Sequence, residues 1–152
     1  MRTTRVFPLA AALLALGMTG CGGDFRKDEP QTAVRDFLGE ALVQQNGQRA
    51  CDYLTQDAQA AIAATGPVGS ACREAMEKAE LVDDGEAVVN TGEVNDLSYE
   101  TTTEGHEATV KVDANGRELT FTLKHDDGLG NLYEPETPWR ITGGAEALVR
   151  GS

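Results

Sequence analysis

The sequence lacks the short motifs that mark most catalytic and nucleotide-binding sites. It contains no Gly-x-Ser-x-Gly, no Walker loop, no His-Glu-x-x-His, no dinucleotide fingerprint and no Cys-x-x-Cys. Histidine, the most common general base, occurs only at His106 and His125. Because no base–nucleophile pair is evident, the sequence predicts neither an enzyme nor a cofactor.

Positive charge is also scarce. The chain has 13 lysines and arginines against 25 aspartates and glutamates, a net charge of −12. Two of the basic residues and none of the acidic ones lie within residues 1–20, so the remainder carries a net charge of −14. Phosphate backbones and anionic lipid headgroups are bound by lysine and arginine. We therefore expect no nucleic-acid partner and no electrostatic attraction to anionic lipid.

No hydrophobic run is long enough for a permanent transmembrane helix. The apolar run of residues 6–18 has thirteen residues and includes Pro8, whereas a spanning helix needs ~20. Arg2 and Arg5 precede the run and small residues follow it. A charged start, a short apolar core and a small-residue end are typical of a secretory signal peptide, which we assign to residues 1–20.

The end of this leader resembles the lipobox of bacterial lipoproteins. Thr19, Gly20 and Cys21 match the pattern, while Met18 stands where leucine is preferred. The resemblance implies cleavage before Cys21, a diacylglycerol thioether on its sulfur, and often a third acyl chain. Two or three acyl chains on one residue make a durable anchor. We expect a lipid-anchored protein on the extracytoplasmic face of the cell membrane, with residues 21–29 as anchor and tether; the alternative is secretion with Cys21 as a spare thiol.

Two further cysteines, Cys51 and Cys72, form an even pair. In an exported protein such a pair favours a disulfide, whereas a metal site or a Cys-His nucleophile would need a nearby histidine. The disulfide would join two short helices.

Periodicity predicts helices in the first half of the chain. Apolar residues recur at helical spacing over residues 33–42, and Asn46-Gly47 is expected to end that helix. Short helices are expected over residues 49–54 and over 56–64, the latter capped by Thr55. A fourth helix is expected to follow Ser70 as its cap.

Alternation predicts strands in the second half, from residue 91 onward. A two-residue loop at Asn115-Gly116 is the strongest hairpin signal. It pairs Val112 with Leu119, Val110 with Phe121 and Ala108 with Leu123 on one face. On the other face it pairs Glu107 with Lys124, which carry opposite charges. A second such loop at Glu104-Gly105 would pair Tyr99 with Val110 and Leu97 with Val112. A last strand is expected after Pro138.

Helices followed by an antiparallel meander with one apolar face indicate an α+β fold. We expect one domain over residues 30–144, with residues 145–152 as a tail. This order of helices and strands is similar to that of small bacterial lipoproteins with a cystatin-like, nuclear-transport-factor-2-like cone. The resemblance rests on residues 33–42, 50–54, Cys72 and 138–141. The resemblance implies a curved four-stranded sheet with helices on one face, and a pocket between them. It also suggests that the long loop of residues 126–138 caps the pocket mouth.

Tyr99, His106 and His125 are the candidate pocket residues. The predicted register sets the two histidines opposite each other on the apolar face, where they would pair at the sheet end or, alternatively, bind Zn²⁺ or sense pH. Tyr99 is interpreted as core or as a pocket residue. Asp52 and Tyr53, near the disulfide, are interpreted as structural. The acidic loop is interpreted as solvated, since its spacing matches no EF-hand calcium loop.

The sequence thus favours a non-catalytic envelope lipoprotein that binds a small apolar ligand or an envelope protein. The alternative is a cone-fold enzyme, isomerase- or hydrolase-like, that uses Tyr99 with His106 or His125. A third possibility is a purely structural component of the envelope.

Overall fold

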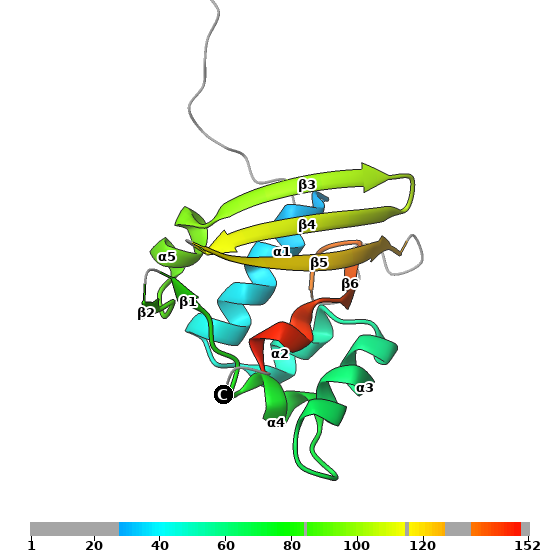
Figure 1. Ribbon diagram of the computed structural model, residues 1–152. Helices are drawn as coiled ribbons and strands as arrows, with labels where there is room; N and C mark the ends of the chain where they lie inside the picture. Colours follow the sequence, from blue (N-terminus) through cyan, green and yellow to red (C-terminus); the bar gives the residue numbers. More distant parts are fainter. Residues whose placement is uncertain (1–27, 84, 115, 127–134, 150–152) are drawn as a thin grey trace, which may run out of the picture.

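A four-stranded antiparallel sheet with helices on one face makes up the centre of the protein (Figure 1). The computed structural model describes residues 28–83, 85–114, 116–126 and 135–149. The predicted signal peptide, Cys21 and most of the tether lie outside these residues. The strands are β3 (Ser98–Glu104), β4 (Glu107–Ala114), β5 (Arg117–His125) and β6 (Trp139–Gly143), paired in that order.

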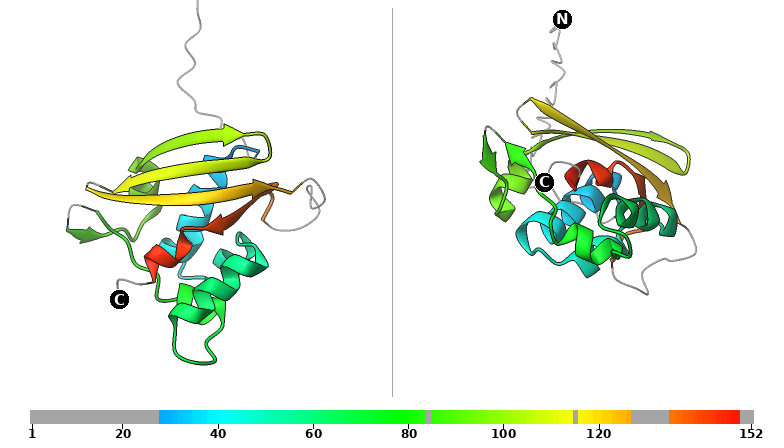
Figure 2. Two further views of the ribbon diagram at one scale, coloured as in Figure 1. Left: turned by 45° about the vertical axis from the view of Figure 1, so that its right-hand side comes forward. Right: turned by 60° about the horizontal axis from the view of Figure 1, so that its bottom comes forward.

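The helices form a second layer beneath the sheet (Figure 2). They are α1 (Pro30–Leu38), continued by a π-helical turn η1 (Gly39–Val43), then α2 (Gly47–Asp52), α3 (Gln56–Thr65) and α4 (Cys72–Met76). At one end of the sheet lie a two-stranded ladder, β1 (Val82–Asp83) with β2 (Glu86–Ala87), and the helix α5 (Thr91–Asp96). A final 3-10 turn, η2 (Ala145–Leu148), follows β6. This is the predicted α+β class.

The predicted amphipathic helix of residues 33–42 is confirmed. Its apolar residues are all buried, and α1 packs against β3, β4 and β6. Phe37 meets Phe121 of β5 edge-to-face, with ring centroids 5.9 Å apart. The helix therefore supplies the face that closes the core against the sheet.

The expected helix end at Asn46-Gly47 is wrong. Gln45 adopts the left-handed conformation, with φ 49°. Asn46 instead caps the next helix, since its Oδ1 accepts a hydrogen bond from the Arg49 amide at 3.1 Å. Gly47 is the first residue of α2, and a Cβ there would lie 2.1 Å from the Arg73 carbonyl oxygen. Glycine is required at this position by the close approach of α2 and α4 rather than by a helix terminus.

Two further helix starts differ in outcome. Thr55 caps α3 as predicted, with its hydroxyl accepting from the Ala58 amide at 3.4 Å. The predicted cap at Ser70 is wrong, because α4 begins at Cys72 and Ala71 is its N-cap residue without a side-chain bond. Cys72, the predicted disulfide partner of Cys51, occupies the first turn of α4.

The β4–β5 register is confirmed in full. Val110 lies opposite Phe121, Ala108 opposite Leu123 and Val112 opposite Leu119, all buried. On the other face Glu107 lies opposite Lys124, the predicted opposite-charge pair. The hairpin turn and the alternation agree, which specifies the pairing.

The β3–β4 register is wrong by two residues. Tyr99 lies opposite Val112 and Thr101 opposite Val110, because the loop is Gly105-His106 and not Glu104-Gly105. Gly105 has φ 61° at the first loop position, where a type II′ turn needs glycine. A shift of one residue in the loop moves the pairing by two, so the same side chains stay on the apolar face and alternation alone does not distinguish the registers.

Leu97 does not belong to a strand, which corrects a second expectation for this region. The segment from Thr91 forms α5 instead, and Leu97 follows it as the C-cap. Asn90 and Glu93 form a capping box, with the Asn90 side chain accepting from the Glu93 amide at 3.0 Å. That Asn-x-x-Glu spacing is the sequence signal for this helix.

The core lies between the two layers and continues into the last turn. Ala145 and Leu148 of η2 are buried in it. The Sγ atoms of Cys51 and Cys72 lie 2.04 Å apart, so the predicted pair is at disulfide distance and joins α2 to α4. Among the described residues, no helix has the length and hydrophobicity to cross a bilayer.

Candidate functional site

A half-open cleft of about 210 Å³ lies between α1, α2 and the segment that leads into β6. Among the described residues that line it, charged side chains surround one aromatic ring, that of Tyr53. We call it the Tyr53 cleft. Its lining residues are Asp36, Glu40, Arg49, Asp52, Tyr53, Pro135, Glu136 and Thr137.

The C-terminal end of α2 positions Tyr53. The residue is the C-cap of α2, and its carbonyl oxygen accepts a hydrogen bond from the Ile141 amide of β6 at 2.8 Å. Its ring packs edge-to-face on Phe37, with centroids 6.5 Å apart. Backbone and ring are thus both held by the core, so that the phenol has a fixed place in the cleft.

Carboxylates dominate the electrostatics of the cleft. Of the lining residues that the structure describes, four are acidic and Arg49 is the one that is basic. Arg49 lies 3.6 Å from the Glu40 carboxylate, and Arg35, beside the cleft on α1, lies 3.0 Å from Asp36. The lining therefore keeps an excess of negative charge.

The same surroundings hold Tyr53 in its neutral form. Burial, reinforced by the Asp36 and Glu40 carboxylates, raises the pKa of Tyr53 to about 12, and Arg49 and Arg140 only partly oppose this. At neutral pH the phenol is protonated, so it can donate and accept hydrogen bonds but is neither a base nor a nucleophile.

Arg140 of β6 supports the wall of the cleft from behind. It is 8% exposed, and its Nη1 donates to the Thr137 carbonyl at 2.6 Å and to the Trp139 carbonyl at 3.1 Å. Burial lowers the pKa of Arg140, while Asp126, Tyr53 and Asp52 oppose the shift. The guanidinium fixes the conformation of the segment that carries Thr137.

No family model, curated protein or solved structure matches the chain. The chemistry of the cleft therefore follows from its own residues and from their placement.

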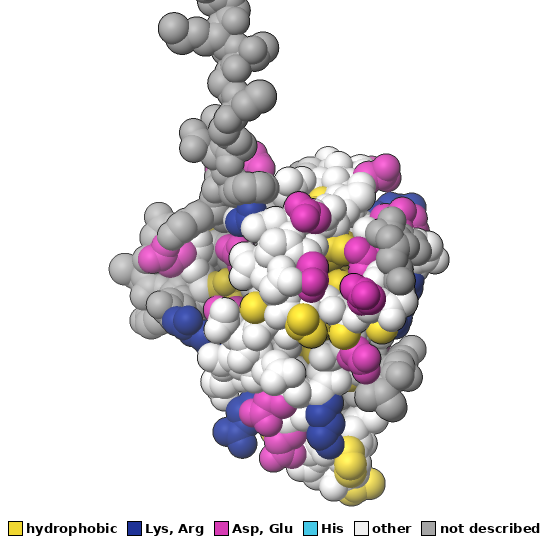
Figure 3. Space-filling view, turned by 90° about the vertical axis from the view of Figure 1, so that its left-hand side faces the viewer, with side chains coloured by type: hydrophobic (Ala, Val, Ile, Leu, Met, Phe, Trp, Pro, Cys, Tyr) yellow, Lys and Arg dark blue, Asp and Glu magenta, His cyan; other side chains and the backbone are white. Residues whose placement is uncertain are grey.

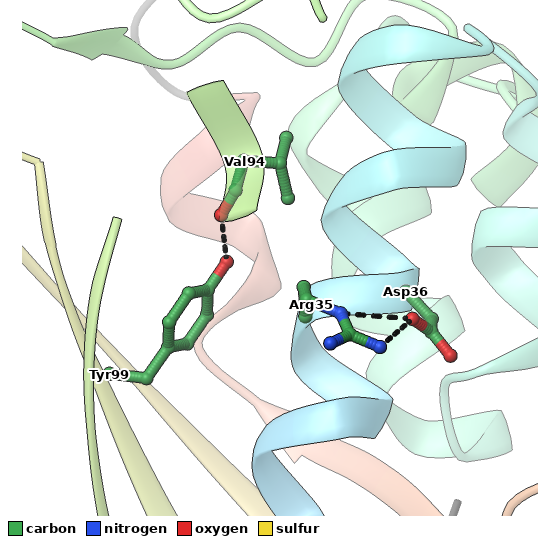
Figure 4. A network of polar contacts seen from close by, with 4 residues as sticks. All are labelled: Arg35, Asp36, Val94 and Tyr99. Atoms are coloured by element: carbon green, nitrogen blue, oxygen red, sulfur yellow. Dashed lines mark hydrogen bonds and ion pairs between the residues drawn. The ribbon is translucent and has the colours of Figure 1, made fainter. Parts of the chain in front are cut away.

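Tyr99, a predicted pocket residue, lies outside the cleft. It extends from β3 toward α5, and its hydroxyl donates to the Val94 carbonyl at 2.7 Å (Figure 4). Arg35 and Asp36 lie on the neighbouring helix α1, where they form an ion pair. Burial raises the pKa of Tyr99, with Arg35 opposing and Asp36 adding to the shift. The residue joins β3 to α5, and its hydroxyl proton is used in this hydrogen bond.

His106 and His125 lie together, as the sequence predicts. Their ring centroids are 5.8 Å apart, and the His125 amide donates to the His106 carbonyl at 2.7 Å. His125 also meets Trp139 edge-to-face at 5.0 Å. Within the described part of the chain, no three histidine, cysteine or acidic residues are placed to share a metal ion.

The structure does not bring Tyr99 to these histidines. Tyr99 is at the α5 end of β3, and the histidines are at the opposite end of the sheet, beyond Glu104. Five residue steps along a strand separate Tyr99 from Glu104, ~17 Å at the usual rise. The Tyr/His pocket of the enzyme hypothesis is therefore not assembled.

The charged residues of the cleft were not identified from the sequence. From the sequence, Asp52 and Tyr53 are interpreted only as structural and Glu136 only as part of a solvated acidic loop, and Arg49 is assigned no role. A signal was present in Asp36 and Glu40, two carboxylates four residues apart on the polar face of the predicted helix. The loop of residues 126–138 does contribute to the cleft, through Pro135, Glu136 and Thr137; residues 127–134 lie outside the described part.

Proposed function

We propose that the protein is a lipoprotein anchored through acylated Cys21 on the extracytoplasmic face of the membrane. Its domain, in a cystatin-like cone, is a non-catalytic binding module of the cell envelope. The lipobox-like residues 18–21 support the anchor. The Cys51 and Cys72 pair at disulfide distance agrees with an oxidising compartment.

The Tyr53 cleft carries the binding part of this proposal. Its lining is charged, so the small apolar ligand expected from the sequence fits it poorly. An excess of carboxylates around an aromatic ring suits a cation, since carboxylates pair with ammonium or guanidinium and a ring face adds cation–π attraction. The volume of about 210 Å³ is below the ~300 Å³ typical of drug-sized ligands. The ligand is therefore a small amine, or the lysine or arginine side chain of an envelope protein.

The cleft lacks the groups that the enzyme alternative requires. No histidine, serine or cysteine is among the described residues that line it, and the Tyr53 phenol is protonated at neutral pH. Tyr99, the tyrosine named in that alternative, is hydrogen-bonded to Val94 and far from both histidines. The geometry of the cleft favours ligand binding over catalysis.

Titration of the full chain with N-acetyl-lysine amide tests the binding proposal. We expect nuclear magnetic resonance shifts confined to Asp52, Tyr53 and Thr137, and no shifts with N-acetyl-glutamate amide. Asp52→Asn should weaken binding roughly threefold, the effect of losing one exposed charge pair. Glu80→Gln, an exposed carboxylate outside the cleft, is the matched control and should change nothing. Equal shifts in the Asn variant, or none in the parent, would contradict the assignment.

Mass spectrometry of the membrane fraction tests the anchor. We expect the mature chain to begin at Cys21 and to carry two or three acyl chains. Cys21→Ala should move the protein to the soluble fraction without changing its circular dichroism. An unmodified Cys21 in the membrane-bound protein would end this part of the proposal and leave the cleft untouched.

A further inference from the structure

The outer edge of β3 is the uncovered edge of the sheet among the described elements. The strand order is β3-β4-β5-β6, so β3 and β6 are the two edges. On β6, Ile141 is bridged to Leu54, and its carbonyl accepts from the Thr55 amide at 2.9 Å. No described helix or strand lies along β3 in the same way (Figures 1 and 2).

Alternate backbone groups of β3 point away from the sheet. Glu104 and Glu107 close the two-residue loop, and such a closing pair exchanges both ladder hydrogen bonds. Pairs with and without hydrogen bonds then alternate, so the amides and carbonyls of Tyr99, Thr101 and Thr103 face outward. No hydrogen bond joins these backbone groups to a described residue outside the ladder.

β3 carries few of the features that normally protect an edge. Proteins blunt exposed edges with lysine, proline, bulges or very short strands. β3 has seven residues, a regular register with β4 and no lysine or proline. Thr101, Thr102 and Thr103 are β-branched and favour the extended conformation. The backbone is therefore preformed for another strand.

The charges on the edge are all negative. Glu100 and Glu104 are exposed, and neither forms an ion pair with another residue that the structure describes. Glu104 lies directly opposite Glu107, a like-charge pair that destabilises the hairpin. Lys111, opposite Glu100, has its Nζ 3.2 Å from Glu118 instead. The strand β3 itself thus carries no positive charge.

This charge argues against a second copy of the chain as the occupant. Antiparallel pairing of two β3 strands about Thr101 would bring the Glu100 and Glu104 carboxylates of both copies onto one face. The net charge of −12 adds general repulsion between copies. A strand with basic side chains meets no such repulsion.

We propose that β3 accepts, by strand addition, an extended segment of a partner protein with lysine or arginine at alternate positions. The partner backbone pairs with the outward groups of Tyr99, Thr101 and Thr103. Its basic side chains lie on the outer face beside Glu100 and Glu104. This site is separate from the Tyr53 cleft and does not depend on it.

The test uses a synthetic peptide of alternating lysine and valine, capped at both ends, with a peptide of alternating glutamate and valine as control. In the full chain, we expect the Thr101 and Thr103 amides to exchange quickly with solvent and to become protected when the lysine peptide is added. The Thr102 amide, which bonds to β4, should be protected in both states. The glutamate peptide should have no effect.

Two variants separate the backbone from the charge. Thr101→Pro removes an outward amide, and proline is tolerated on the solvent side of an edge strand, so we expect loss of peptide binding with an unchanged circular dichroism spectrum. Glu100→Gln with Glu104→Gln should weaken binding roughly fivefold and reduce its salt dependence, while Glu80→Gln, an exposed carboxylate outside the sheet, should not.

Three results would overturn the proposal: equal binding of the two peptides, unaltered binding to Thr101→Pro, or a lack of protection at Thr101 and Thr103. Dimerisation of the parent chain through β3 at neutral pH, measured by sedimentation, would identify a second copy as the occupant and also contradict it.

Discussion

Two tyrosines of the domain, Tyr53 and Tyr99, have phenols whose pKa is raised in the folded state, chiefly by burial. An unfolded tyrosine ionises at a pKa of about 10, and Tyr53 in the fold at about 12. The folded state therefore holds these protons more tightly than the unfolded state does. The resulting stabilisation is complete below pH ~10 and is lost as the pH rises through ~12.

We expect the urea midpoint to fall steeply between pH 10 and 12, since unfolding then releases the phenolic protons. Tyr53→Phe and Tyr99→Phe should each make this fall shallower, because phenylalanine does not titrate. Circular dichroism at a series of pH values measures it. Between pH 7 and 9 the urea midpoint should change with pH equally in the parent and the variants. If both variants lost stability between pH 10 and 12 as steeply as the parent, the assignment would be contradicted.

The Cys51 and Cys72 pair spans 21 residues and joins α2 to α4. Replacing both cysteines with serine should lower the free energy of unfolding by ~3 kcal/mol, because the unfolded chain regains the entropy of an open loop. Urea unfolding of the double variant, beside the parent with and without reductant, measures the change. If the reduced parent were as stable as the oxidised one, the two cysteines would not be bonded.

At the scale of elements, the contact between α2 and α4 depends on the absence of a side chain at Gly47. A Cβ there would lie 2.1 Å from the Arg73 carbonyl. Gly47→Ala should therefore destabilise the domain by ~2–3 kcal/mol, the usual cost of overpacking.

Gly39 provides the matched control. It has helical φ and ψ of −59° and −45°, and a Cβ there would meet nothing within 4 Å. Gly39→Ala should be neutral or stabilise by up to ~1 kcal/mol, through helix propensity. Both variants are compared by thermal unfolding; a loss of similar size at the two positions would show that the clash at Gly47 is not the cause.

The elements that the sequence predicts well are those with two local signals in agreement. Between β4 and β5, the Asn115-Gly116 turn and the alternation specify one register. Between β3 and β4 the alternation allows two registers, and only the turn geometry at Gly105 distinguishes them. Helix α5 is short, and its capping box at Asn90 and Glu93 is its main signal.

The candidate site was less predictable, because it is assembled from distant parts of the chain. Asp36 on α1, Tyr53 after α2 and Thr137 before β6 meet only in the tertiary structure. Periodicity tells which face of a helix is polar but not what lies opposite that face. The His106 and His125 pair was predictable because a hairpin register brings the two together.

At the scale of the whole molecule, charge governs how copies of the protein meet. The sequence carries a net charge of −12, and acidic side chains are spread over the face drawn in Figure 3. Static light scattering should therefore show strong mutual repulsion at 0.01 M salt, where the screening length is ~30 Å. Repulsion should largely vanish at 0.3 M salt. A scattering signal independent of salt would mean that the charges are compensated by bound cations.

Trp139 is the only tryptophan in the sequence. Its indole is 5% exposed, donates to the Asp28 carbonyl at 2.7 Å and meets the His125 ring. A single buried indole at the point where the chain enters α1 makes intrinsic fluorescence a local probe. Its emission reports whether the start of α1 is attached to β6, and so allows the junction beside the tether to be followed by optical spectroscopy in the unlabelled protein.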